Sequence, residues 1–289
     1  MPSFFKLSSL VTSLLTTFAA KRRLVQLKQQ WQIFSLALMF FTRIPVSRSV
    51  PYSAQRMNQA NRYFSLVGLI VGGLVALVFL TFKSWLPLEV TVVLMMIASV
   101  LLTGAFHEDG LADMADGIGG GLDKAQRLNI MKDSRIGTYG AVTLLLALLL
   151  KFYLLVYFAE NSVVIFALIC AYGLSRALAA SLIFDTEYVS EDLLSKSKPL
   201  AVQQSRVELL ILLAVAGVPT IFFISQFYQP LMLLIKLSVI LVLFRFAFRH
   251  WLIARLTGFT GDCLGAAQQI AELLIYLVIA SHIFTGGLA

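Results

Sequence analysis

Seven apolar segments, each long enough to cross a bilayer, constrain this chain more than any other feature. A membrane-spanning helix needs about 20 predominantly apolar residues. Hydrophobic residues make up 59% of the chain and charged residues only 13%, a balance that excludes a water-soluble domain. The segments lie at residues 63–82, 89–106, 138–158, 162–184, 207–225, 231–249 and 267–285. We therefore predict an all-α fold, a polytopic integral membrane helical bundle with about six to eight transmembrane helices.

Two kinds of connection join these segments: short turns on one side of the membrane and long polar loops on the other. Short turns lie at residues 83–88, 159–161 and 226–230, and long loops at residues 42–62, 107–137, 185–206 and 250–266. Because successive spans reverse direction, the long loops share one side, which carries nearly all the loop Lys and Arg residues. The positive-inside rule places that side in the cytoplasm. We expect a multi-pass protein of the bacterial inner membrane, with catalytic loops at the cytoplasmic boundary.

The amino-terminal region follows a different pattern. Residues 31–41 are apolar but too short to span a bilayer, which predicts an interfacial or re-entrant segment. Residues 1–20 are amphipathic and predict a helix lying on the membrane surface. Four basic residues separate the two stretches: Lys21, Arg22, Arg23 and Lys28. We divide the chain into a basic extension, 1–30, and a catalytic membrane domain, 31–289.

The net charge and the cysteines limit which ligands and cross-links the chain is expected to have. A net charge of +8 agrees with a lipid bilayer containing anionic headgroups and with anionic substrates. The basic residues are scattered without interleaved aromatic residues, so we expect no nucleic acid. Cys170 and Cys263 have neither CxxC spacing nor a neighbouring His, which argues against a disulfide framework and a zinc site.

A run of acids follows the second predicted span. Asp109, Asp113 and Asp116 are spaced i, i+4, i+7 and therefore share one face of a helix. Three carboxylates on one face repel each other unless a cation holds them, and oxygen ligands suit Mg²⁺. We predict that these three acids bind metal. Asp262, which precedes the last span, is either a fourth metal ligand or a helix cap.

Glycines and bases follow the acids. Gly119 and Gly120 allow the backbone to approach an anion closely, and three cations suited to phosphate oxygens come next: Arg127, Lys132 and Arg135. Arg176 lies inside a predicted span, where an unpaired guanidinium costs about 3 kcal/mol or more. It either has an internal acidic or phosphate partner or snorkels to the cytoplasmic surface. Acids that bind metal beside bases that bind phosphate indicate phosphoryl chemistry.

Three side chains are candidates for accepting a proton from an attacking hydroxyl group. Asp116 is the first choice, and His107 and Asp133 are the others. His107 stands at a span boundary, where an interfacial or supporting histidine is an equally good interpretation.

Four segments together resemble the cobalamin synthase family, also named adenosylcobinamide-GDP ribazoletransferase. They are residues 41–46, 107–121, 130–140 and 260–266. The resemblance runs in order over roughly residues 30–285. It implies a membrane enzyme that condenses adenosylcobinamide-GDP with α-ribazole or its 5′-phosphate, releases GMP and requires Mg²⁺. Association with other late cobamide-pathway enzymes, or with further copies of the chain, is compatible with this role, although no residue argues for it.

Two other classes share part of this pattern. A CDP-alcohol phosphotransferase of phospholipid synthesis also uses intramembrane Asp residues and Mg²⁺, but its motif continues from Asp-Gly to Ala-Arg. Here Asp109-Gly110 continues to Leu111, Ala112 and Asp113, so the motif fails. An ion-coupled transporter would place its acids near the bilayer midplane on broken helices. The acids here cluster at one predicted boundary, which favours the enzyme.

Overall fold

The computed structural model describes residues 3–46, 50–189 and 201–286, with side chains from residue 21 onward. Within these ranges the chain is helical and forms no strand, apart from one isolated bridge between Tyr188 and Phe259. The α-helices are α1 Ser3–Phe41, α2 Ala54–Ala60, α3 Phe64–Phe82, α4 Leu88–Thr103, α5 Phe106–Gly120, α6 Lys124–Met131, α7 Thr138–Glu160, α8 Val164–Ser181, α9 Arg206–Ile224, α10 Pro230–Leu256 and α11 Gly261–Phe284. Short 3₁₀ turns follow α2 and α8, at Asn61–Tyr63 and Leu182–Phe184. The predicted all-α fold is confirmed.

Six helical segments of the described ranges are long and apolar enough to cross a membrane. They are α2 continued into α3, then α7, α8, α9, α10 and α11. A seventh crossing is formed only if α4 and α5 are counted together, because that pair is bent by 86°. The predicted polytopic bundle is therefore confirmed, and its span number falls within the predicted range.

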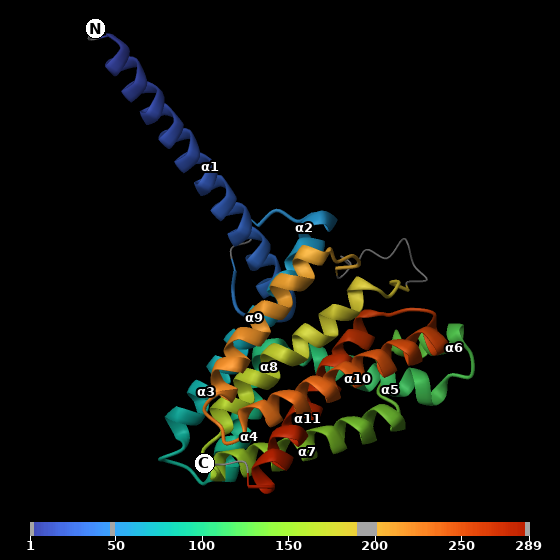
Figure 1. Ribbon diagram of the computed structural model, residues 1–289. Coiled ribbons are helices and arrows are strands. Elements are labelled where there is room, and N and C mark those ends of the chain that lie inside the picture. The colour runs from blue at the N-terminus through green and yellow to red at the C-terminus, as the bar shows by residue number, and fades with distance from the viewer. Residues whose placement is uncertain (1–2, 47–49, 190–200, 287–289) are drawn as a thin grey trace.

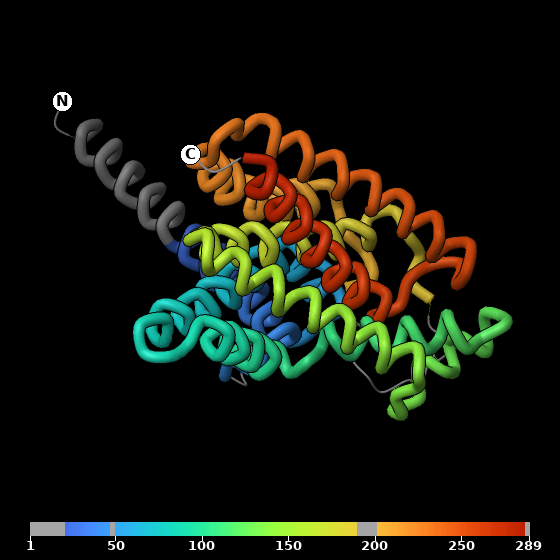
Figure 2. Tube along the Cα trace, turned by 90° about the horizontal axis from the view of Figure 1, so that it is seen from below, coloured from blue at the N-terminus to red at the C-terminus, as the bar shows by residue number. Residues whose placement is uncertain are grey.

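Two helices form the centre of the bundle. In α8, 83% of the span is buried, and in α11, 67%, whereas only 22% of α7 and 17% of α10 is buried. Figure 1 shows α8 in the middle of the bundle, and Figure 2 shows α10 and α11 along one side with α4 on the opposite side. Apolar residues of α7 and α10 that face outward, such as Leu145 and Leu243, are exposed as lipid-facing side chains require.

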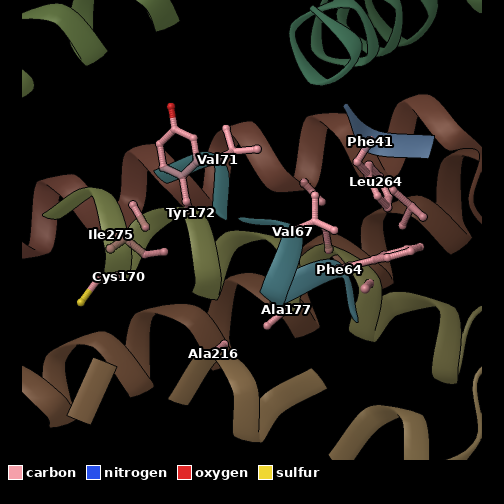
Figure 3. Close-up of a cluster of buried hydrophobic side chains, with 14 of the residues drawn as sticks. Phe41, Phe64, Val67, Val71, Cys170, Tyr172, Ala177, Ala216, Leu264 and Ile275 are labelled. Atoms are coloured by element: carbon pink, nitrogen blue, oxygen red, sulfur yellow. The ribbon is translucent and has the colours of Figure 1, made fainter. Parts of the chain in front are cut away.

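The core is built from α3, α8 and α11. Figure 3 shows Val67 and Val71 of α3 beside Tyr172 and Ala177 of α8. Close approach of α3 to α8 depends on a small residue, because a Cβ added at Gly68 would lie 2.2 Å from the Tyr172 carbonyl oxygen. Small residues at such interfaces let membrane helices pack backbone to backbone.

The break between α4 and α5 is made by two consecutive left-handed residues. Gly104 has φ +68° and Ala105 has φ +58°. A left-handed non-glycine residue costs of order 1–3 kcal/mol and persists where its surroundings hold it. The backbone N–H of Arg43 donates to the Leu102 carbonyl oxygen at 2.7 Å, which ties the chain after α1 to this break.

The amino-terminal region is one continuous helix. α1 passes through residue 30 without interruption, so the proposed division at 30/31 falls inside a helix. Residues 31–41 are the end of α1 and not a re-entrant loop, and Ile33, Leu36 and Phe41 are buried against the bundle. The side chains of residues 1–20 lie outside the description, so their amphipathic role remains a prediction.

Candidate active site

The acidic stretch forms helix α5, as its spacing predicted. Asp109 is exposed, Asp113 is half-buried and Asp116 is buried. α5 packs closely on the start of α11, because a Cβ added at Gly110 would lie 3.0 Å from the Cα of Asp262. The absence of a side chain at Gly110 therefore brings Asp262 beside the acids of α5.

The four acids share one electrostatic environment. The pKa of Asp113 is raised to about 7, mainly by burial and then by the charges of Asp109, Asp262 and Asp116. α5 is not among the six helices that span the membrane by themselves. Like charges gathered this way disfavour one another's ionised form, and a bound cation would relieve that repulsion.

The carboxylates of α5 and Asp262 suit Mg²⁺, although they do not form a complete metal site by themselves. In the described ranges, no group of three or more His, Cys, Asp or Glu side chains converges as a ready metal site. Mg²⁺ usually binds through one or two carboxylates and shares its remaining positions with water and substrate phosphates. The acids of α5 and Asp262 suit that mode because all of them supply oxygen.

Asp116 also has a structural role that its sequence position did not reveal. Its Oδ2 accepts a hydrogen bond from the Gly137 N–H at 2.7 Å, and its Oδ1 accepts one from the Gly140 N–H at 2.8 Å. Gly137 and Gly140 thus approach the protein's own carboxylate, at the start of α7. Each Asp116 oxygen keeps one lone pair for another partner.

The start of α11 excludes one of the two interpretations of Asp262, the helix cap, and leaves the metal ligand as a prediction. Thr260 caps this helix, since its Oγ1 accepts from the Cys263 N–H at 3.3 Å. The helix-cap interpretation of Asp262 is therefore wrong. Asp262 lies in the first turn of α11, where the helix dipole favours a negative charge.

Arg127 fastens a loop to the end of α10. Its guanidinium donates to the carbonyl oxygens of Gly121, Leu122 and Arg255 at 3.0 to 3.1 Å. Three of its five donors are therefore committed to the protein, which gives Arg127 a structural role, and its contact with phosphate stays a prediction.

The remaining candidates of the loop lie at the surface. Arg135 forms an exposed ion pair with Asp133 at 2.6 Å, and this hydrogen bond lowers the pKa of Asp133 to about 2. A carboxylate with so low a pKa is a poor proton acceptor near neutral pH. Lys132 is exposed beside this pair. Arg135 and Lys132 are thus both exposed in the segment between α6 and α7.

The two predicted substrate-binding glycines, Gly119 and Gly120, end α5 and are exposed. A Cβ added at Gly119 would lie 2.5 Å from the Tyr139 ring, so the absence of a side chain lets that ring pack on α5. At Gly120 the nearest neighbour would be Ile130 at 3.4 Å. Packing therefore accounts for Gly119, and the space at Gly120 is less restricted.

His107 is buried behind the acids. Its ring stacks on Phe41, with centroids 5.8 Å apart and planes 8° from parallel. Burial, and then the charges of Arg176 and Lys151, hold its pKa well below the usual range, so the imidazole is neutral. His107, Arg176 and Gln268 line a cavity of about 20 Å³, which is space for a single water molecule.

Arg176 stays inside the bundle. The residue is only 4% exposed, so the snorkelling interpretation is wrong. Its Nη1 donates to the Tyr172 carbonyl oxygen at 3.1 Å, and its guanidinium lies 5.0 Å from the Tyr172 ring centroid. The charges of Glu272 and Glu108 act on it. These acids provide the internal acidic surroundings that its position in a span requires.

The sequence analysis missed a buried polar network below the acids. Lys151 of α7 pairs with Glu272 of α11 at 2.6 Å, and both side chains are at most 5% exposed. Gln268 donates to Glu272 at 2.7 Å and to Ser175 at 3.0 Å. Gln269 donates to Glu108 at 3.1 Å, which connects the network to α5. Lysine inside a predicted span was the available signal, since intramembrane charges are usually functional.

Comparison with known proteins finds relatives along most of the chain. The chain matches the family model described as Cobalamin-5-phosphate synthase over residues 33–280. It is 54% identical to adenosylcobinamide-GDP ribazoletransferase of Vibrio parahaemolyticus, a match that covers 89% of this chain and 95% of the relative. Identity to the protein of the same name is 52% in Vibrio cholerae, covering 89% and 96%, and 50% in Shewanella piezotolerans, covering 87% and 96%.

No solved structure matches the chain. The matched region nevertheless includes all of α5 and the start of α11, the two helices that supply the acids. It also includes Lys151 and Glu272 of the buried network. With this coverage and these identities, the chain belongs to the cobalamin-5-phosphate synthase family.

Proposed function

We propose that this protein joins adenosylcobinamide-GDP to α-ribazole or α-ribazole 5′-phosphate and releases GMP. This is the late nucleotide-loop assembly step of cobalamin biosynthesis. The observation that carries the proposal is the docking of the acidic face of α5 against Asp262 of α11, in a chain that belongs to this family. The reaction breaks the pyrophosphate of the GDP group and forms a phosphodiester with the ribazole hydroxyl.

Asp109, Asp113 and Asp262 would hold Mg²⁺. One of the two free lone pairs of Asp116 would serve as a further ligand, which leaves the other to accept a proton. When bound, Mg²⁺ supplies positive charge against the pyrophosphate oxygens and the departing GMP. Lys132 and Arg135, which are exposed between α6 and α7, would hold phosphate oxygens by charge-assisted hydrogen bonds. The chain's own contribution is therefore to position an anionic substrate between acids and bases.

Asp116 is the proposed acceptor of the ribazole proton. The N–H groups of Gly137 and Gly140 fix the orientation of its carboxylate, as a proton acceptor requires. The other two candidates suit the role less well. His107 is enclosed by aromatic rings, and Asp133 is held by Arg135. Arg176 lies inside the bundle, where the charges of Glu272 and Glu108 act on it, and its direct contact with a substrate phosphate stays a prediction.

The orientation that brings these residues to their substrates is cytoplasmic. We propose that the chain lies in the bacterial inner membrane with α5, α6 and the start of α11 on the cytoplasmic side. The distribution of Lys and Arg in the long connections supports this orientation. Binding to other enzymes of the same pathway, or to further copies of the chain, remains a prediction.

The test is reconstitution of the purified chain in liposomes with Mg²⁺, adenosylcobinamide-GDP and α-ribazole phosphate. Chromatography follows GMP and the corrinoid product. We expect GMP release matched by product formation, lost when a chelator removes the metal and restored by Mg²⁺. Asp113→Asn should lower turnover by about 100-fold or more, because a charge that binds the metal is removed.

Asp123→Asn is the matched control. Asp123 is exposed, and its side chain only caps α6 by accepting from the Gln126 N–H, which Asn also does well. Turnover of Asp123→Asn should equal that of the unmodified chain. Equal activity of Asp113→Asn would contradict the metal site, and a folded chain that forms no product would contradict the reaction and make CDP-alcohol substrates the next to assay.

A further inference from the structure

The outer part of α1 carries a surface that the proposed reaction does not use. Its apolar residues Leu24, Leu27 and Trp31 are 67%, 65% and 65% exposed. Their i, i+3, i+7 spacing aligns them along one face of the helix. Three large apolar side chains in a row are unusual on a surface that faces only water.

The same segment carries only positive charge. Lys21, Arg22, Arg23 and Lys28 are exposed, and none of them forms an ion pair with another residue of the described ranges. The chain contains no Asp or Glu before Glu89. An exposed helix with cations beside an apolar stripe complements an anionic surface that also offers hydrocarbon.

Contacts with Tyr63 fix the position of the exposed part of α1 relative to the start of α3. The Tyr63 hydroxyl donates to Gln30 Oε1 at 2.7 Å, and the Tyr63 ring packs edge-on against Phe34. Tyr63 immediately precedes α3, the continuously apolar part of the first spanning segment, so we take this junction as the level at which that segment enters the bilayer. Tyrosine is typical of that boundary. From this junction α1 leaves the bundle, as Figure 1 shows.

We infer that residues 21–31 of α1 dock on the anionic lipid surface of the membrane face at which α3 begins. Leu24, Leu27 and Trp31 enter the region between headgroups and acyl chains, and the four cations contact lipid phosphates. Trp31 suits this position because its ring is amphipathic. The family match begins only at residue 33, so this surface lies outside the region that defines the family.

Trp31 is a built-in probe of this contact. Replacing the other two tryptophans, as Trp85→Phe and Trp251→Phe, leaves Trp31 as the sole indole. The full chain is reconstituted in phosphatidylcholine vesicles with or without phosphatidylglycerol. Lipids brominated near the headgroup end of the acyl chain, or near its methyl end, report the depth of the ring, and iodide reports exposure to water.

In vesicles containing phosphatidylglycerol we expect the Trp31 emission to be blue-shifted and only weakly quenched by iodide. Lipids brominated near the headgroup end should quench most of the emission, and lipids brominated near the methyl end should quench less of it. Changing all four cations to Gln should restore iodide quenching and reduce bromine quenching. Leu24→Gln with Leu27→Gln should do the same. The matched control changes Gln26 and Gln29, which lie away from the stripe, to Ala and should leave every signal unchanged.

Two results would overturn the inference. Strong iodide quenching with no bromine quenching would place this segment in water. Protection from both quenchers, with disulfide crosslinking of Leu24→Cys between chains at low protein density, would assign the surface to a second copy. Because these signals come from Trp31 alone, circular dichroism of each variant is sufficient to confirm that it has folded.

Discussion

At the scale of single residues, several glycines of this protein allow another group to approach the backbone closely. Gly137 and Gly140 let two backbone N–H groups reach Asp116, and Gly110 lets α5 contact α11 at Asp262. From the sequence, Gly119 and Gly120 were the glycines expected to approach an anion. The structure also brings a carboxylate to Gly137 and Gly140, through contacts between residues 21 and 24 positions apart that no local pattern encodes.

Gly140→Ala tests this arrangement. The new Cβ would lie 2.3 Å from Asp116 Oδ2 and 2.8 Å from the Ala112 carbonyl oxygen, so α5 and α7 must separate. We expect a loss of about 1–3 kcal/mol in stability, typical of overpacking, and a large loss of turnover. Thermal unfolding in detergent and the GMP assay measure the two effects.

Gly217→Ala is the control for that change. A Cβ there would meet nothing within 4 Å, and α9 should gain up to about 1 kcal/mol from the better helix former. If both alanine variants melted at the same temperature as the unmodified chain, the close fit around Asp116 would be wrong.

At the scale of elements, α5 is held between two helices that come later in the chain. Glu108 near its start accepts a hydrogen bond from Gln269 of α11, and Asp116 near its end accepts two from the start of α7. Since residues 108 and 109 point about 100° apart on a helix, fixing Glu108 inward turns Asp109 outward. The pairing thus sets which face of α5 carries the exposed carboxylate of Asp109.

Exchanging Glu108 and Gln269 tests whether their hydrogen bond fixes the rotation of α5. Glu108→Gln and Gln269→Glu alone each disturb a buried hydrogen bond and the local charge, and should cost about 1–3 kcal/mol. The double exchange restores both the hydrogen bond and the net charge. We expect it to recover stability and turnover relative to either single variant, measured by melting and by GMP release. Simple addition of the two losses would rule out direct coupling.

The pair formed by Lys151 and Glu272 joins α7 to α11. Removing one partner of a buried ion pair leaves an uncompensated charge and costs about 3–5 kcal/mol, so Lys151→Met should lower the melting temperature strongly. Lys151→Met with Glu272→Gln should melt closer to the unmodified protein, because the amide is neutral and can still bond to Gln268. A double variant less stable than Lys151→Met would contradict this account.

The sequence predicted spanning elements well and polar connections less well. Residues 138–158 and 207–225 were expected to span, and α7 and α9 occupy Thr138–Glu160 and Arg206–Ile224. Residues 107–137, predicted as a polar loop with a helical acidic stretch, contain both α5 and α6. Hydropathy reports the length of a span directly. It says nothing of which buried polar partners meet, so the network of Lys151, Glu272 and Gln268 could not be assembled from the sequence.

At the scale of the whole molecule, the proposed orientation predicts which surfaces face the cytoplasm. The native Cys170 and Cys263 are buried and should not react with a membrane-impermeant maleimide. Ser84, between α3 and α4, and Ser134, before α7, are exposed and lie in connections of opposite sides. Ser84→Cys should react in cells with a permeabilised outer membrane, and Ser134→Cys only after the inner membrane is opened. The reverse pattern would invert the orientation.

The 86° bend between α4 and α5 has a consequence for how the protein is made. Its acidic helix leaves the ribosome long before α11, which completes the surroundings of those acids some 150 residues later. Until then Glu108 lacks Gln269, and Asp109 and Asp113 lack Asp262. A nascent chain therefore carries these acids before their neighbours in α11 exist. Under the proposed metal site, the chain gains that site only when its last helix has been made, so completion of synthesis is the step that assembles it.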